Sequence, residues 1–377
     1  MSFEDLYNIH HYEDDEVSEV ISSLLEDQDL FALVSTLKPG LQKYLPSFIS
    51  TKLSKNFLTT IFRDSDSIES FQSSLAPIVE EMIKRTTSEF TISGIENLNS
   101  IPALYISNHR DIALDSLFLN IARYRQGLST VRIAIGDNLL NGKFSEKIMR
   151  LNKSFIVHRE IKGVKETLKK LMNLSAYVNK SLIEDRESIW IAQLEGRAND
   201  GNDITDPAVL KMLHLSQRKE KDLNNWLNEV NLTPITISYE FDPLDVTKAI
   251  GWEGWRDLSL EENNKRDIKE LINGLIGNKG RVNLHIGEPI MNSDSYEELA
   301  RAIDKSMHEN FKIYPSAEIS DQLLEGKTAN ELGDAFNKEY LHNFITRFKS
   351  LDEELKVKVF AMYAAPLINK KRGQSGD

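Results

Sequence analysis

The rhythm of apolar positions changes near residue 89. Before this point apolar residues recur with i, i+4 spacing, as in the stripe from Phe48 to Phe62, which is typical of amphipathic helices. After it, seven short apolar runs alternate with amphipathic stretches, and from about residue 294 the helical rhythm returns. The seven runs are residues 90–94, 103–107, 131–136, 154–158, 188–194, 233–241 and 281–287.

Short β-rich runs separated by helical segments predict an α/β fold, with a mostly parallel mixed sheet flanked by helices. An N-terminal helical bundle precedes the sheet, and C-terminal helices follow it. We therefore divide the chain into an N-terminal helical domain (1–88), an α/β domain (89–300) and a C-terminal helical extension (301–377). The stripe at 48–62 has two interpretations: the core of the bundle, which we favour, or a face that lies on a membrane.

Composition narrows the class of protein. The 377 residues carry a net charge of −12, which argues against nucleic-acid binding, and contain no cysteine, which excludes thiolate chemistry. No apolar run reaches the roughly 18–20 residues that span a bilayer. The first residues, MSFEDLYNIHHYEDDE, lack an apolar signal core. We expect a cytoplasmic protein, with peripheral contact at the cytoplasmic membrane face as an option.

One segment is basic within this acidic chain. Residues 143–170 hold nine Lys or Arg against three Glu. Such a segment is either the solvated face of a helix or a local attractor for a phosphate or an acidic carrier protein. Both interpretations stay open.

The stretch SNHRDIALDS at 107–116 carries the candidate chemistry. His-Arg-Asp suggests a protein-kinase catalytic loop, but that loop needs Asn where this chain has Ser116, and the Gly-rich loop and the Asp-Phe-Gly motif are missing. The alternative is an acyl-transfer base. The run 103–107 leads directly to His109, and Asp115 lies near the start of an apolar helix, where its carboxylate can orient the imidazole as a general base. A turn histidine capped by an aspartate is the non-catalytic interpretation.

SNHRDIALD resembles the first motif of the glycerolipid acyltransferases, the family of glycerol-3-phosphate and 1-acylglycerol-3-phosphate (lysophosphatidate) acyltransferases. Four residues separate His and Asp in that family, whereas five separate His109 from Asp115 here. Asp115 is the favoured partner of His109 because it heads the helix as the family aspartate does, and a one-residue bulge must then be accommodated. Asp111 is the alternative partner.

Three further segments follow in the family's order, so that the resemblance covers about residues 89–290. The segment ending in SFIVHRE resembles the second motif, which delivers basic residues to the acceptor phosphate. SIWIAQLEGRANDG resembles the third motif, although Asn199 stands where the soluble plastid-type enzymes have a second Arg. LTPITISYEFDP resembles the fourth motif, whose proline shapes the acyl pocket. The residues that match are His158 and Arg159, then Glu195, Gly196 and Arg197, and finally Pro234.

The resemblance implies an acyltransferase of phospholipid synthesis. The donor would be an acyl thioester on acyl carrier protein or coenzyme A, and the acceptor glycerol 3-phosphate or a related glycerol phosphate. His109 would be the general base and Asp115 its partner. Apart from the resemblance, we take a backbone N–H near the 108–112 turn as a candidate oxyanion donor. No cofactor and no metal are implied. Lysophosphatidate acylation and a catalytically inactive lipid-binding relative are the alternatives.

Overall fold

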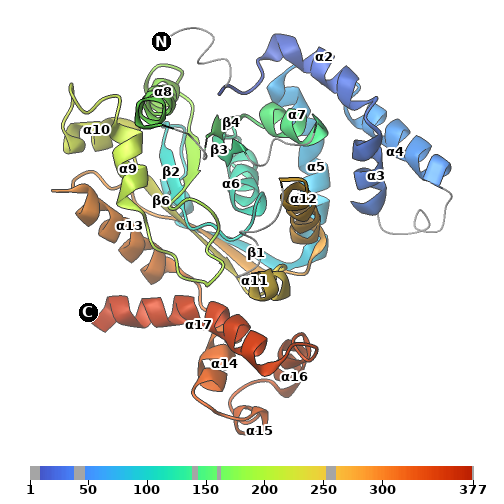
Figure 1. Cartoon of the computed structure of the whole chain (residues 1–377), viewed down its shortest axis with the longest axis vertical. Helices are drawn as coiled ribbons and strands as arrows, with labels where there is room; N and C mark the ends of the chain where they lie inside the picture. Colours follow the sequence, from blue (N-terminus) through green and yellow to red (C-terminus); the bar gives the residue numbers. More distant parts are fainter. Residues whose placement is uncertain (1–8, 38–46, 138–142, 159–162, 252–259, 376–377) are drawn as a thin grey trace.

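A seven-stranded sheet forms the centre of the computed structural model, which describes residues 9–37, 47–137, 143–158, 163–251 and 260–375 (Figure 1). The strand order is β1-β7-β6-β2-β5-β3-β4. The strands are β1 (Thr87–Ser93), β2 (Leu104–Ser107), β3 (Arg132–Gly136), β4 (Ser154–Val157), β5 (Ile189–Ala192), β6 (Thr233–Tyr239) and β7 (Gly280–Ile286).

Strand direction divides the sheet into two parts. β6, β2, β5, β3 and β4 are parallel to one another, whereas β7 pairs antiparallel with β6 and carries β1 parallel to itself. The predicted mostly parallel mixed sheet is therefore confirmed. All seven predicted strands are present, with ends shifted by no more than three residues.

Sixteen α-helices surround the sheet within the described ranges. They are α2 (Asp14–Leu24), α3 (Gln28–Leu37), α4 (Ser47–Ile61), α5 (Ile68–Thr86), α6 (Leu114–Arg125), α7 (Lys143–Leu151), α8 (Val164–Ile183), α9 (Pro207–His214), α10 (Leu223–Val230), α11 (Asp245–Gly251), α12 (Leu260–Ile276), α13 (Tyr296–Asn310), α14 (Pro315–Leu324), α15 (Ala329–Leu332), α16 (Lys338–Thr346) and α17 (Glu353–Ser375).

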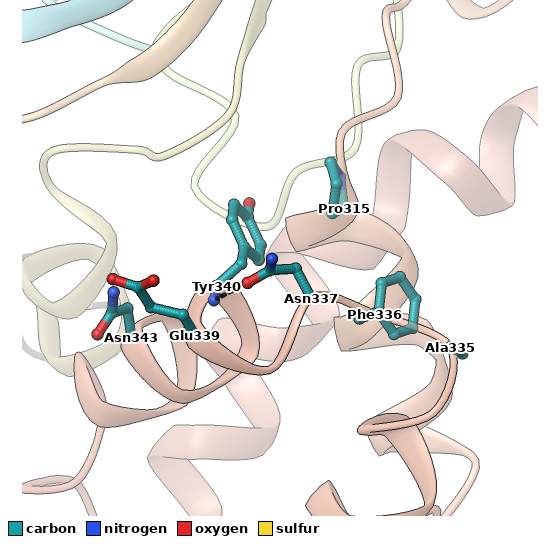
Figure 2. A pocket seen from close by; sticks show the side chains of 7 residues that line it. All are labelled: Pro315, Ala335, Phe336, Asn337, Glu339, Tyr340 and Asn343. Atoms are coloured by element: carbon teal, nitrogen blue, oxygen red, sulfur yellow. Dashed lines mark hydrogen bonds between the residues drawn. The ribbon is translucent and has the colours of Figure 1, made fainter.

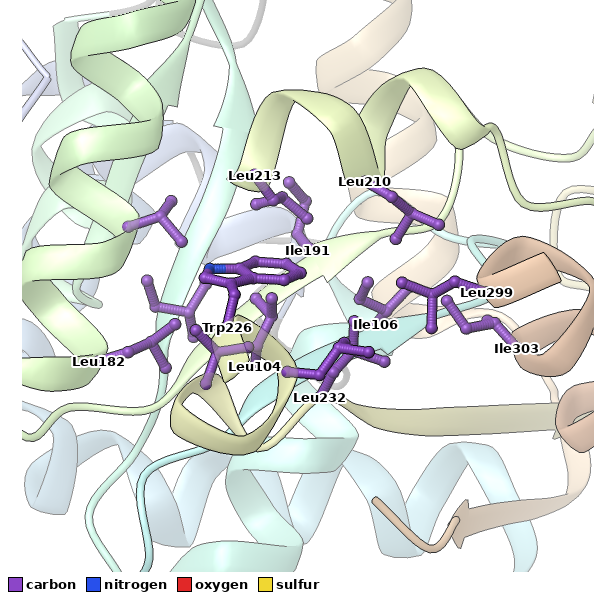
Figure 3. Packing of buried hydrophobic residues seen from close by; sticks show 14 of the residues in the cluster. Leu104, Ile106, Leu182, Ile191, Leu210, Leu213, Trp226, Leu232, Leu299 and Ile303 are labelled. Carbon is purple, nitrogen blue, oxygen red and sulfur yellow. The ribbon is translucent and has the colours of Figure 1, made fainter. Parts of the chain in front are cut away.

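Each face of the sheet has its own apolar core. On one face, Leu104 and Ile106 of β2 pack with side chains of α8, α9, α10 and α13, among them the fully buried Trp226 (Figure 3). On the other face, Tyr105 and residues of β6 and β7 pack with α6 and with Ile83 of α5. Because strands covered on both faces are apolar at nearly every position, they read as the short continuous runs seen in the sequence.

The N-terminal helices share a third apolar cluster. Phe31, Leu58, Phe62 and Phe71 are buried in it, together with residues of α7. The bundle interpretation of the 48–62 stripe is therefore confirmed for Leu58, whereas Leu53 of the same helix is exposed. α5 leads directly into β1.

The C-terminal helices α14–α17 share a fourth cluster, which also includes Ala249 of α11 (Figure 1). Phe344 and Phe348 lie at its centre and pack edge-on against each other. Among the described helices of the whole chain, none combines the length and the apolar character that crossing a membrane requires. The predicted boundaries at 88 and 300 stay predictions.

Candidate active site

Three neighbouring strands bring the predicted catalytic segment together. β2 lies between β5 and β6 and is parallel to both. The carboxyl ends of parallel strands meet at one edge of a sheet, where reactive groups of α/β proteins gather. The turn after β2 carries His109, and the loop after β5 touches it, since the Ala198 N–H donates to the His109 carbonyl at 2.9 Å.

His109 pairs with Asp115. The distance from His109 Nδ1 to Asp115 Oδ2 is 2.8 Å, and the two side chains are 15% and 0% exposed. Because a buried carboxylate faces Nδ1, the proton of the neutral ring belongs on that nitrogen, and Nε2 is left with its lone pair. Trp190 of β5 packs edge-on against the imidazole, with ring centroids 5.6 Å apart.

Asp115 accepts hydrogen bonds from three further donors. The backbone N–H groups of Arg110 and Asp111 donate to Oδ2 at 2.7 and 3.0 Å, and the Tyr239 hydroxyl donates to Oδ1 at 2.8 Å. Burial alone would raise the pKa of Asp115, but the bonds from His109, Asp111 and Tyr239 outweigh it and the pKa is lowered. The carboxylate therefore stays ionised beside the imidazole. Two N–H groups of the turn predicted to hold an oxyanion are used by Asp115 instead.

Asp111 has a different task. Its Oδ1 accepts from the backbone N–H groups of Ala113 and Leu114, each at 3.0 Å, and so satisfies donors at the start of α6. This local turn takes up the extra residue between His109 and Asp115. Burial and the charge of Asp115 raise the pKa of Asp111. Its Oδ2 is buried, and no described residue donates a hydrogen bond to it.

The raised pKa of Asp111 predicts a pH-dependent stability. An unfolded aspartate loses its proton near pH 4, whereas folded Asp111 does so at higher pH. The folded chain therefore binds more protons in this window, so the group's contribution to stability is present below about pH 4 and falls as pH rises through its folded pKa. Asp111→Asn removes the ionisation and keeps the acceptor oxygen. We expect the free energy of unfolding of Asp111→Asn, relative to wild type, to increase from about pH 4 upward.

Urea unfolding of both proteins at a series of pH values measures this difference. Asp294→Asn, at an exposed carboxylate, is the control and should follow wild type at every pH. A difference between Asp111→Asn and wild type that stays constant with pH would contradict the prediction.

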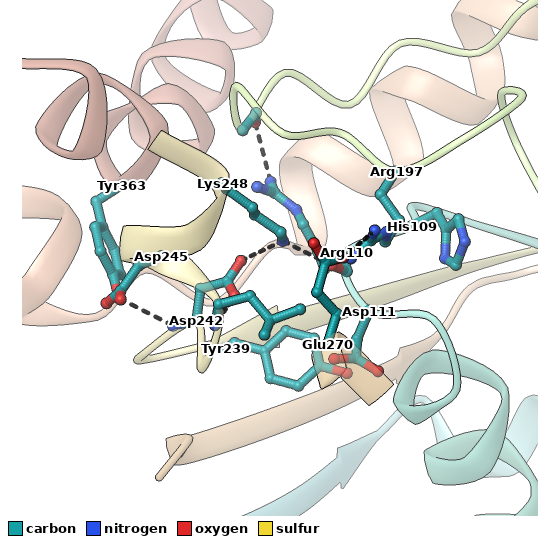
Figure 4. Close-up of polar contacts among 12 residues, drawn as sticks. His109, Arg110, Asp111, Arg197, Tyr239, Asp242, Asp245, Lys248, Glu270 and Tyr363 are labelled. Carbon is teal, nitrogen blue, oxygen red and sulfur yellow. Dashed lines mark hydrogen bonds and ion pairs between the residues drawn. The ribbon is translucent and has the colours of Figure 1, made fainter. Parts of the chain in front are cut away.

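Hydrogen bonds between buried polar groups stabilise the turn that carries His109 (Figure 4). The Arg110 guanidinium donates to Asp203 Oδ2 at 2.5 Å and to the Gly201 carbonyl at 3.0 Å, while Lys248 Nζ donates to the Arg110 carbonyl at 2.7 Å. Asn108 Nδ2 donates to the Ile237 carbonyl at 2.9 Å, and its Oδ1 accepts from the Ile237 N–H at 2.8 Å. These contacts fix the backbone on both sides of His109.

The third predicted segment lies beside His109. Gly196 has φ of +85°, a conformation that L side chains rarely adopt, and so makes the turn after β5. Glu195 is exposed. Arg197, 11% exposed, donates from one guanidinium nitrogen to Glu270 Oε2 of α12 at 2.5 Å. Its second terminal nitrogen, Nη1, is buried and has no hydrogen-bond partner among the residues that the structure describes.

Of the other predicted residues, the structure describes His158 and Pro234. His158 follows β4, and its Nδ1 is 3.1 Å from Asp137 Oδ2. β4 is three strands from β2, which at about 4.8 Å per strand places His158 roughly 14 Å from the β2 end. Arg159 lies outside the described residues. Pro234 is buried in β6 opposite Ile106, on the sheet face that Tyr239 does not share.

Sequence reasoning missed four contributors to this site: Tyr239, Asp203, Lys248 and Glu270. Of these four, Tyr239 could have been noticed in the sequence, because it is a polar residue near the end of the predicted run 233–241. The other three carry no such signal, because only folding brings them to the turn. A separate pocket lies among the C-terminal helices, lined by Pro315, Phe336 and Tyr340 among others, and none of the predicted site residues lines it (Figure 2).

Comparison with known proteins finds two similarities. The model of a family described as Acyltransferase matches residues 89–216. A search of curated proteins finds no match. Among solved structures, the fold is similar to the 1-acyl-sn-glycerophosphate (LPA) acyltransferase PlsC from Thermotoga maritima, with a TM-score of 0.36 and 15% sequence identity, covering 74% of this chain and 92% of that chain.

The matched residues include His109, Asp115 and the turn that carries Arg197. The family model thus matches about a third of the chain, and this match agrees with the resemblance to acyltransferases seen in the sequence.

Proposed function

We propose that this protein transfers a fatty acyl group from an acyl thioester to glycerol 3-phosphate or a related glycerol phosphate, with His109 as the general base. One observation carries the proposal: His109 Nδ1 lies 2.8 Å from the buried Asp115 carboxylate at the carboxyl edge of the sheet. Within the described part of the chain, no hydrogen-bond partner is found for Nε2. That nitrogen is therefore available to a substrate hydroxyl.

The reaction needs one proton to move twice. Nε2 of His109 removes the proton of the acceptor hydroxyl while that oxygen attacks the thioester carbonyl. A C–O bond forms, the C–S bond breaks, and the proton passes from the imidazolium to the leaving sulfur. Asp115 stabilises the imidazolium between the two transfers. A positioned base of this kind contributes about 10²–10⁴-fold in rate.

Arg197 is the candidate ligand of the acceptor phosphate. Its loop is hydrogen-bonded to the His109 backbone, and its side chain is 11% exposed. Among the described residues, its Nη1 has no hydrogen-bond partner. A guanidinium suits a phosphate oxygen because it supplies charge-assisted donors. Arg159 and His158 stay predicted contributors to the same role.

Incubating the purified protein with labelled acyl-carrier-protein or acyl-coenzyme A thioester and a panel of acceptors tests the proposal. The panel holds glycerol 3-phosphate, lysophosphatidate and glycerol. We expect an acyl ester of glycerol 3-phosphate, and the more active thioester identifies the donor. Product from lysophosphatidate alone would assign the later acylation step. Absence of product with every pair would contradict the proposal and favour an inactive lipid-binding relative.

A further inference from the structure

Glu270 of α12 stands between two guanidinium groups beside the candidate active site (Figure 4). Its Oε2 accepts from Arg197 at 2.5 Å, and its Oε1 lies 3.6 Å from Nε of Arg266, one helical turn away. The Glu270 side chain is only 2% exposed. A phosphate bound at this place would also be flanked by two guanidinium groups and largely shielded from water, as the Glu270 carboxylate is.

The charges of this cluster cancel. Asp267 accepts from Arg266 at 2.9 Å, so that two acids face two arginines. Within these four described side chains, an incoming phosphate at Arg197 therefore meets no net positive charge, and it meets the negative charge of Glu270 at short range. In a poorly solvated site such a repulsion is weakly screened.

Glu270 cannot turn away easily. Gly274 lies one turn further along α12, on the same helix face. A Cβ at Gly274 would lie 2.3 Å from Asp111 Oδ2, so α12 lies in close contact with the turn that follows His109. This packing fixes the helix, and with it the carboxylate of Glu270, next to Arg197.

We propose that Glu270 is a specificity-determining residue that competes with the acceptor phosphate for Arg197 and weakens the binding of anionic acceptors. The inference rests on the proposed function, because it takes Arg197 as the phosphate ligand. The acceptor phosphate contacts the solvent-exposed part of the Arg197 side chain, which is 11% exposed, while Glu270 retains the nitrogen that faces it and opposes the charge of the phosphate.

Glu270→Gln removes the negative charge of this side chain and keeps its size. The amide oxygen still accepts from Arg197, so the guanidinium stays oriented, but the negative charge is gone. We expect the Kd of glycerol 3-phosphate, measured by titration calorimetry on the full chain, to fall about tenfold. In an Arg197→Ala background the same substitution should leave the Kd unchanged, because the arginine for which Glu270 and the phosphate compete is absent.

Glu262→Gln, an exposed position on the same helix, is the matched control and should leave the Kd at the wild-type value. If Glu270→Gln does not fold, Asp267→Asn removes the other acid of the cluster and should lower the Kd about two- to threefold. An unchanged or raised Kd in the folded variant overturns the inference. Binding is measured separately from turnover. If the substitution tightens binding but the protein transfers no acyl group, the proposed function is wrong and the role of Glu270 stands.

Discussion

We expect His109→Ala to lower kcat for acyl transfer by about 10²–10⁴-fold, because it removes the proposed general base. The fold should survive this change. Asp115, which loses one donor, keeps the N–H groups of Arg110 and Asp111 and the Tyr239 hydroxyl. Steady-state rates with the active thioester and acceptor, together with a thermal unfolding curve, measure both halves of the expectation.

His342→Ala is the matched control, because His342 is exposed on α16 among the C-terminal helices. It should leave kcat at the wild-type value. Near-normal turnover in a folded His109→Ala protein would show that the imidazole is not the general base. The role proposed for Asp115 would then be wrong as well.

The sequence reveals the strands of this fold more readily than their pairing. β2 and β5 are buried at nearly all positions, and such runs are visible without knowledge of their neighbours. The antiparallel pairing of β6 with β7 is different, because apolar runs do not encode strand direction. What the alternating pattern predicted was a mostly parallel sheet, and the structure shows where the exception lies.

The candidate site shows the same difference between local features and contacts made by residues far apart in the sequence. His109 and Asp115 are 6 residues apart, within one strand–turn–helix unit, so the local pattern favoured their pairing while Asp111 stayed the alternative. Tyr239 reaches Asp115 from 124 residues away, and Glu270 reaches Arg197 from 73 residues away. No local rule connects such residues. Arg197 was predicted as a phosphate ligand from the resemblance of its segment to the third family motif, but the acid that pairs with it became visible only in the folded chain.

Asp115→Asn lowers kcat by about 10²–10³-fold, which corresponds to roughly 3–4 kcal/mol of barrier. The carboxylate's surroundings dictate how the amide sits. Two backbone N–H groups, those of Arg110 and Asp111, face Oδ2, so the amide oxygen takes that position and its NH₂ faces the Tyr239 hydroxyl. His109 Nδ1 can then still donate to the oxygen. The ring keeps its orientation and its proton, and what is lost is the negative charge that stabilises the imidazolium.

Asp111→Asn decides between the two aspartates in the same assay. Asp111 bonds to the N–H groups of Ala113 and Leu114 and not to the imidazole, so its substitution should change kcat by less than about threefold. If Asp111→Asn is the slower enzyme, the pairing of His109 with Asp115 is not the catalytic one. If both substitutions are mild, the carboxylate serves to orient a ring that needs no anionic partner, and acyl transfer must draw its rate from the positioning of the two substrates.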